Sequence, residues 1–297
     1  LLLNVRVREE RRGDYNAQFS ALHLAARRLI EMINKYSSNL IKNVFDEIID
    51  RTYERMLSAI ALIPDGVYRF EDVMDDDGRD AVNVPINLTA TIKGKSALFD
   101  FEGTSPQTPG NINIPLHGTK AAVCYVLKAM LDPDIPNNQG VLDAVEVVAP
   151  MGTMVSCIAP ASVAARAHTS QRIIDVVIGA LSPALPASAV GAANGANTMA
   201  VFAGNSPETG EPYVYLETLG GGFGGRNDRD GKDGVQVVWG IIDGAHRFTA
   251  ASDDNQERII AWLVDMPLKK IPKFANAELN RIECPQLDRS PEDIAAS

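Results

Sequence analysis

The sequence predicts an α+β fold, in which an N-terminal helical hairpin packs on mixed, mostly antiparallel sheets. Up to about residue 63, apolar residues recur every three or four positions, as on one face of a helix. After Gly66 the apolar period changes to two, which is typical of half-buried strands. The later helical and strand patterns do not alternate regularly, which argues against a doubly wound parallel sheet.

Two helices are expected in the first segment, residues 1–65. Asp14 is suited to cap the first helix, whose apolar stripe consists of Phe19, Leu22, Ala26, Leu29 and Ile33. Ser37-Ser38 interrupts the pattern. A second helical pattern runs through residues 41–63, with a break around Thr52, and ends at a Pro-Asp-Gly turn.

The body, residues 66–266, is expected to combine strands, helices and an ordered loop. Alternating apolar residues predict an antiparallel hairpin of residues 82–90 and 97–101. Residues 102–116 contain too many turn formers for a helix or a central strand, so they predict a loop. The other expected elements are helices at 119–131 and 169–181, strands at 144–148, 199–202, 213–218 and 235–242, a small-residue stretch at 187–197 that lets backbones approach closely, and a peripheral tail at 267–297.

Composition and charge exclude several functional classes. The chain has 297 residues and a net charge of −10, so the electrostatic attraction that dominates nucleic-acid and anionic-membrane binding is missing. The three cysteines are widely spaced and form no C-x-x-C, so neither a disulfide framework nor a Cys-based zinc site is indicated. No apolar run reaches the length of a membrane span, and no signal segment is recognisable. We therefore expect a cytoplasmic protein in a reducing compartment.

A glycine-rich turn at residues 220–226 is the densest local signal. Gly220, Gly222 and Gly225 satisfy G-x-G-x-x-G after a predicted strand, but no helical pattern follows to hold a phosphate. A backbone that needs positive φ and close approach is the better explanation, and a tight crossing of chain segments and a ligand contact both remain open. Glu217 precedes this turn at a strand end, where either catalysis or a turn hydrogen bond would explain it.

Other nucleotide, metal and nucleophile motifs are missing. Gly94-Lys95-Ser96 ends like a phosphate-binding loop, but Thr89 stands where its first glycine belongs. No G-x-S-x-G surrounds a serine, and the four histidines form no H-x-x-x-H pair. His117 directly precedes a predicted helix, whose N–H groups can hold an anion. Arg166 and His168 flank the start of the next helix and are suited to a carboxylate or phosphate. A hydrogen-bonded loop role explains His117 equally well, and packing on the fold surface is the better explanation for Arg166.

The order of several motifs resembles the hydantoinase B family, which includes N-methylhydantoinase B subunits, the C-terminal half of 5-oxoprolinases and subunits of acetone and acetophenone carboxylases. The matching stretches are Arg12–Gln18, Ile63–Tyr68 with Asp77-Gly78, Asp100–Gln107 with Gly110–Asn113, and Tyr215–Thr218 leading into Gly220–Arg226. Family members are usually about twice as long, and the half that carries a histidine and aspartate cluster associated with metal has no counterpart here. The resemblance therefore implies a truncated hydantoinase B-like fold without a metal site.

The resemblance also implies a function. Family chemistry requires ATP and Mg, which are held by a hydantoinase A-like partner, so this chain is expected to bind no cofactor itself, and any metal is expected elsewhere in a hetero-oligomer. The first hypothesis is a subunit of an acetophenone carboxylase-type enzyme that forms a β-keto acid from a ketone and bicarbonate. The alternatives are a subunit of an ATP-dependent cyclic-amide hydrolase and a non-catalytic assembly subunit. The candidate residues are Glu217 and His117 for catalysis, and Asn113, Arg166, Gly221, Gly222 and Arg226 for substrate binding.

Overall fold

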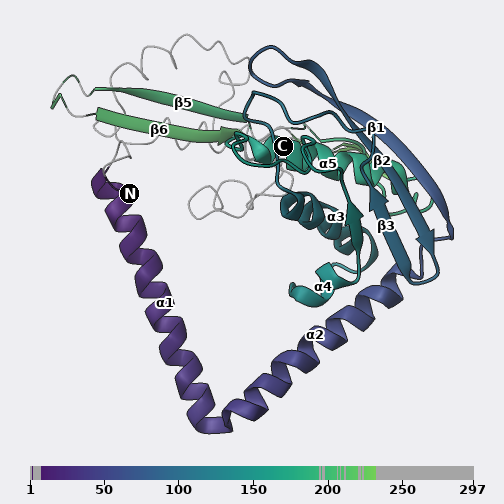
Figure 1. Cartoon of the computed structure of the whole chain (residues 1–297), viewed down its shortest axis with the longest axis horizontal. Helices are drawn as coiled ribbons and strands as arrows, with labels where there is room; N and C mark the ends of the chain where they lie inside the picture. The colour runs from purple at the N-terminus through teal and green to yellow at the C-terminus, as the bar shows by residue number, and fades with distance from the viewer. Residues whose placement is uncertain are drawn as a thin grey trace, which may run out of the picture.

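The structure is a computed structural model that describes residues 2, 8–193, 195, 198–205, 207, 209–210, 212–219, 222 and 224–231. Helices cover one side of a four-stranded sheet, two further helices extend from this body as a V, and a two-stranded ribbon projects beyond it (Figure 1). The predicted α+β class and mixed sheet are confirmed. The expected strand at 235–242 and the expected tail at 267–297 lie outside the described residues.

The N-terminal segment forms two continuous helices, α1 (Arg8–Tyr36) and α2 (Ser38–Ile60). Ser37 separates them with a φ of 71°, and its hydroxyl accepts a hydrogen bond from the N–H of Leu40. Two sequence predictions for this segment were wrong. Asp14 lies inside α1, where it pairs with Arg11 at 2.7 Å instead of capping the helix. Thr52 does not interrupt α2, because its hydroxyl donates to the carbonyl of Ile48 within the helix.

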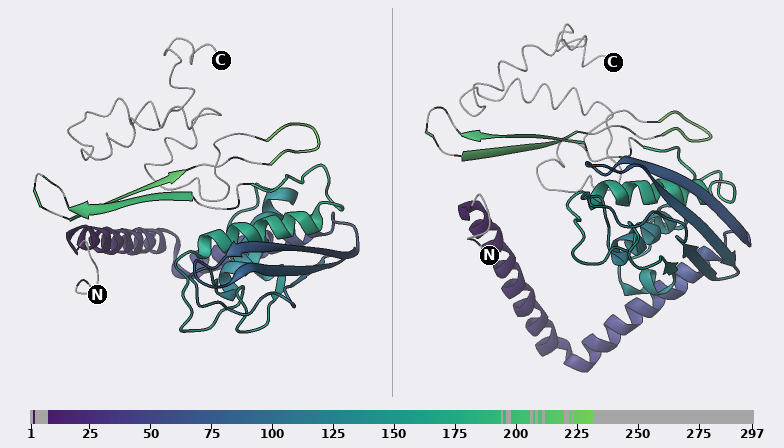
Figure 2. Two further views of the ribbon diagram at one scale, coloured as in Figure 1. Left: turned by 90° about the horizontal axis from the view of Figure 1, so that it is seen from above. Right: turned by 45° about the horizontal axis from the view of Figure 1, so that its top comes forward.

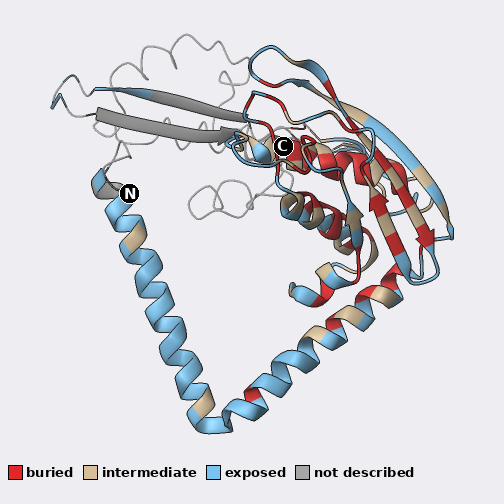
Figure 3. Ribbon diagram, in the orientation of Figure 1, coloured by how far each residue is buried: buried red, intermediate tan, exposed pale blue. Residues whose placement is uncertain are grey.

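The two helices do not close into a packed hairpin. They diverge from Ser37, so α2 reaches the body and α1 stands away from it (Figures 1 and 2). Among the described side chains of α1 none is buried, and the predicted stripe residues Phe19 and Leu22 are 58% and 64% exposed (Figure 3). One residue is too short to reverse the chain into an antiparallel helix pair, which needs a loop of about two to five residues. The predicted apolar residues thus lie on one continuous helix, but nothing in the described part of the chain buries them.

The sheet contains β1 (Gly66–Asp76), β2 (Val82–Lys93), β3 (Ser96–Asp100) and β4 (Glu146–Val148), in that spatial order. The first three strands pair antiparallel, whereas β4 pairs parallel to β3. Strand β2 buries alternate residues, from Val84 to Ile92, as the period of two predicted. Strand β1 was not predicted, because this edge strand buries no residue and lacks the alternation.

Helices α3 (Leu116–Leu131) and α5 (Arg166–Leu181) pack against the buried face of this sheet and against each other, and Ile173 and Val177 of α5 are fully buried. The short helix α4 (Gln139–Asp143) anchors α2, since Asn138 at its N-terminus donates to the Thr52 hydroxyl at 2.8 Å. Beyond α5, β5 (Thr198–Asn205) and β6 (Pro212–Leu219) form an antiparallel ribbon, which confirms the two predicted strands. Among the described helices, none combines the length and apolar content needed to cross a bilayer.

Candidate functional site

The turn-rich loop between β3 and α3 is held rigidly from inside by Asn113. This side chain is fully buried; its Oδ1 accepts from the N–H of Thr108, and its Nδ2 donates to the carbonyls of Thr108, Gly110 and Ser162 at 2.9–3.0 Å. Every polar atom of the side chain is thus occupied by backbone. This geometry favours a structural role for Asn113 over the substrate-binding role expected from the sequence.

Asp77 joins the β1–β2 turn to the same loop. The carboxylate accepts hydrogen bonds from the N–H groups of Arg79, Gly110 and Ala81. Burial acts to raise the pKa of Asp77, but these hydrogen bonds outweigh burial and hold the pKa below its ordinary value. A Cβ on Gly110 would overlap the Asp77 carbonyl, so only glycine fits this contact. Two separate stretches of the family resemblance therefore meet at one structural junction.

The loop also brings together the N-termini of α3 and α5. The carbonyl of Asn111 accepts from the N–H of Ala165 at 2.9 Å, and the carbonyl of Ile112 accepts from the Thr169 hydroxyl. Neither helix has a side-chain hydrogen bond at its cap, and His117 and Arg166 lie exposed in the first turns. Helix N-termini and cationic side chains both favour anions. The loop thus contacts the start of α5 directly before Arg166 and leads into α3 directly before His117.

The glycine-rich turn crosses the small-residue stretch that follows α5. The N–H of Gly191 donates to the carbonyl of Gly225 at 2.8 Å, and a Cβ on Gly224 would overlap the backbone of Gly191. The described residues thus contain a close crossing of chain segments, which was one of the two explanations that the sequence left open for the glycine-rich turn. Instead of the helix start that a dinucleotide site requires, Arg226 and Arg229 form a tight β-bridge at this point.

Of the remaining candidate residues, the structure describes Gly222, Arg226 and the backbone of Glu217. Gly222 is buried with a φ of 99°, a conformation that glycine adopts without strain. The side chain of Arg226 is exposed. Glu217 pairs with Ala200 across the β5–β6 ribbon, but its side chain and Gly221 lie outside the described residues. The catalytic and binding roles of these residues remain predictions.

Sequence reasoning missed a partly buried ionic cluster next to the crossing. Arg172 of α5 donates to Asp72 of β1 at 2.7 Å and lies 3.6 Å from Asp175. Burial raises the pKa of Asp175 to about 6, although Arg172 and a backbone hydrogen bond from Ala193 act to lower it. The available signal was a charged pair three residues apart within the apolar pattern of α5.

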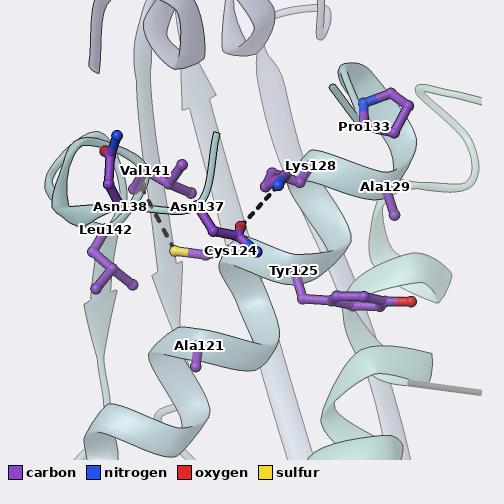
Figure 4. A pocket seen from close by; sticks show the side chains of 10 residues that line it. All are labelled: Ala121, Cys124, Tyr125, Lys128, Ala129, Pro133, Asn137, Asn138, Val141 and Leu142. Atoms are coloured by element: carbon purple, nitrogen blue, oxygen red, sulfur yellow. Dashed lines mark hydrogen bonds between the residues drawn. The ribbon is translucent and has the colours of Figure 1, made fainter. Parts of the chain in front are cut away.

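The cavity between α3 and α4 contains none of the predicted site residues. It has a volume of about 630 Å³, and apolar side chains and Asn138 line it together with Cys124, Tyr125 and Lys128 (Figure 4). Lys128 donates to Asn137 at 2.8 Å. Burial raises the pKa of the Cys124 thiol to about 11, so this thiol stays protonated at neutral pH and is a poor nucleophile. Across the described residues, no group of three His, Cys, Asp or Glu side chains is arranged to hold a metal ion.

Comparison with known proteins supports the family resemblance of the sequence motifs. The sequence profile described as hydantoinase B/oxoprolinase matches residues 1–243. The chain belongs to this family. The B-type chain of a putative D-/L-hydantoinase from a Pseudomonas species (strain NS671) is 32% identical over 238 residues, which cover 76% of this chain and 40% of that protein.

Two solved structures have the same fold. The ATP-dependent caprolactamase of Pseudomonas jessenii matches 79% of this chain and 41% of its own, with a TM-score of 0.72 and 26% identity. The nucleotide-free acetone carboxylase matches 73% of this chain and 31% of its own, with a TM-score of 0.61 and 16% identity, which shows the fold alone. The chain thus spans 40% of the hydantoinase chain, 41% of the caprolactamase chain and 31% of the acetone carboxylase chain that it matches.

Proposed function

We propose that this chain belongs to a B-type subunit of an ATP-dependent complex that opens cyclic amides. The observation that carries the proposal is the junction of Asp77, Gly110 and Asn113, formed by family motifs within a fold shared with an ATP-dependent caprolactamase. The sequence identities favour amide cleavage over ketone carboxylation. The hydantoinase chain and the caprolactamase are 32% and 26% identical to this chain, whereas acetone carboxylase is 16% identical. This order reverses the sequence-based preference for a ketone carboxylase.

In this proposal a hydantoinase A-like partner holds ATP and Mg and transfers a phosphoryl group to the amide oxygen. Water then attacks the activated carbon, the C–N bond breaks to release the amine, and a second water cleaves the resulting acyl phosphate into carboxylate and phosphate. His117 and Arg166, at two helix N-termini beside the pinned loop, are placed to hold an anionic group of the substrate or intermediate. Glu217 stays the candidate for acid–base work, and Gly221, Gly222 and Arg226 stay candidates for substrate contact.

Carboxylation of a ketone is the second candidate. The observation in its favour is the fold shared with acetone carboxylase. In that reaction a phosphorylated enol attacks activated bicarbonate and forms a β-keto acid. A third hypothesis makes the chain a non-catalytic assembly subunit, and the exposed stripe of α1 supports such a bridging role.

The test is to purify the native complex and to measure ATP hydrolysis with different substrates. Hydantoins, 5-oxoproline or a lactam should stimulate ATP hydrolysis several-fold without bicarbonate. Stimulation by acetophenone that requires bicarbonate would establish the carboxylase instead. If an amide is the substrate but the turnover survives replacement of His117, Arg166 and Glu217 together, this chain serves assembly and the site assignment fails.

A further inference from the structure

A partly buried ionic cluster connects the sheet to α5, and the side chain of Asp72 in this cluster is 30% exposed. Arg172 Nη1 donates to Asp72 Oδ2 at 2.7 Å and lies 3.6 Å from Asp175 Oδ2. The side chains of Arg172 and Asp175 are only 21% and 8% exposed. Because buried charges are costly without partners, the three side chains depend on each other for their position.

The stretch that follows α5 lies directly on this cluster. The N–H of Ala193 donates a hydrogen bond to Asp175. Gly195 has a φ of 69°, and a Cβ there would overlap Nη2 of Arg172. The backbone therefore runs against both charged side chains, and its positive φ favours a glycine at position 195.

The same stretch holds the glycine-rich turn. Two residues before Ala193, the N–H of Gly191 donates to Gly225, and Gly224 packs against the Gly191 backbone without room for a side chain. A continuous series of contacts thus leads from Asp72 in the sheet, through Arg172 and Asp175, to the turn that contains Gly222.

We propose that Arg172 and Asp175 are positioning residues that hold Gly191, Ala193 and Gly195 in place, and through them Gly224 and Gly225 of the glycine-rich turn. Arg172 and Asp175 of α5 contact the backbone beside the crossing. The crossing itself consists of glycines, which contribute no side-chain packing. Loss of either side chain should therefore loosen the crossing while the sheet remains folded. The proposal rests on the proposed function only in placing this turn at the active site.

Amide hydrogen exchange measures this directly, because the N–H groups of Gly191 and Arg226 are hydrogen-bonded in the crossing and its turn. In Arg172→Ala and in Asp175→Ala, which removes the acceptor for the Ala193 N–H, peptides that contain these amides should exchange about ten-fold faster or more. Peptides from β2, whose amides lie in the core, should keep their wild-type rates. Arg172→Lys retains the charge and should restore part of the protection.

The matched control is Asp132→Asn. Asp132 and Arg55 form an ion pair of similar length, 2.6 Å, between a loop and α2. Its loss should leave exchange around Gly191 and Arg226 unchanged.

Two outcomes would overturn the positioning role. One is unchanged exchange at Gly191 and Arg226 in Arg172→Ala. The other is equal acceleration in β2, which would mean that the cluster stabilises the core as a whole. The turnover of the complex is a separate readout: if exchange accelerates but turnover stays constant, the positioning role holds and the assignment of the turn to the active site fails.

Discussion

At the scale of single residues, Asn113 illustrates how a residue from a family motif can be structural. Its side chain has no free polar atom, since backbone groups of the loop and of Ser162 occupy all of them. We predict that Asn113→Ala lowers the unfolding free energy by about 1–3 kcal/mol, because the buried backbone groups lose their partners. Chemical denaturation measures the change, and Asn111→Ala, an exposed position in the same loop, is the control. An unchanged stability with weakened substrate binding would restore the binding role.

The buried aspartates Asp77 and Asp175 should respond to pH in opposite directions. The pKa of Asp77 is lowered, so its stabilising contribution is present above the ordinary aspartate pKa and is lost as pH falls through the lowered value. The pKa of Asp175 is raised to about 6, so the relative stability it confers is present at low pH and is lost as pH rises through 6.

Substituting Asp175 isolates its contribution. In the wild type, the titration of Asp175 should lower the free energy of unfolding by at most about 1.4 kcal/mol per pH unit between pH 4 and 6. Asp175→Asn should abolish this pH-dependent decrease. Asp77→Asn should instead flatten the acid limb below pH 4. Thermal melts of the two variants from pH 3 to 8 measure both effects, and identical pH profiles for wild type and Asp175→Asn would contradict the assignment for Asp175.

At the scale of elements, the crossing depends on one glycine of an adjacent pair. A Cβ at Gly224 would overlap the Gly191 backbone, whereas a Cβ at Gly225 would meet its nearest neighbour at 3.7 Å, an ordinary contact. We predict that Gly224→Ala opens the crossing and makes the region around residue 191 susceptible to limited proteolysis. Gly225→Ala should resemble wild type. Equal protease resistance in both variants would argue against a tight crossing.

The first helix carries an apolar seam that the described residues leave exposed. Tyr15, Phe19, Leu22, Ala26, Leu29, Ile33 and Tyr36 follow each other at alternating steps of four and three residues, the spacing of a coiled-coil seam. In line with the proposed assembly, Leu22→Glu with Leu29→Glu should abolish association with the hydantoinase A-like subunit in co-purification. Circular dichroism should show an intact body, and Arg27→Glu on the opposite helix face is the control. Full association of the double variant would exclude α1 from that interface.

At the scale of the whole molecule, the chain shares its fold with parts of larger ATP-dependent enzymes. The sequence contains no phosphate-binding loop. We predict that the isolated chain neither binds ATP at micromolar concentration nor hydrolyses it, and that hydrolysis appears only with the partner subunit. Isothermal calorimetry with Mg-ATP provides the measurement, and micromolar binding by the chain alone would contradict the assignment of ATP to the partner.

Local sequence patterns were enough to predict the four long helices, most described strands and the family, because these features depend on periodicity and short motifs, whereas the five-residue α4 was missed. The apolar stripe of α5 and the alternation of β2 therefore predicted these two elements. The edge strand β1 was not predicted, because it buries no residue. Which motif residues are structural became clear only from the folded chain. The contacts of Asp77 with Gly110 and of Arg172 with Asp72 join positions 33 and 100 residues apart. Such long-range hydrogen bonds leave no local periodicity, so sequence patterns predict the elements but not the partners that hold them together.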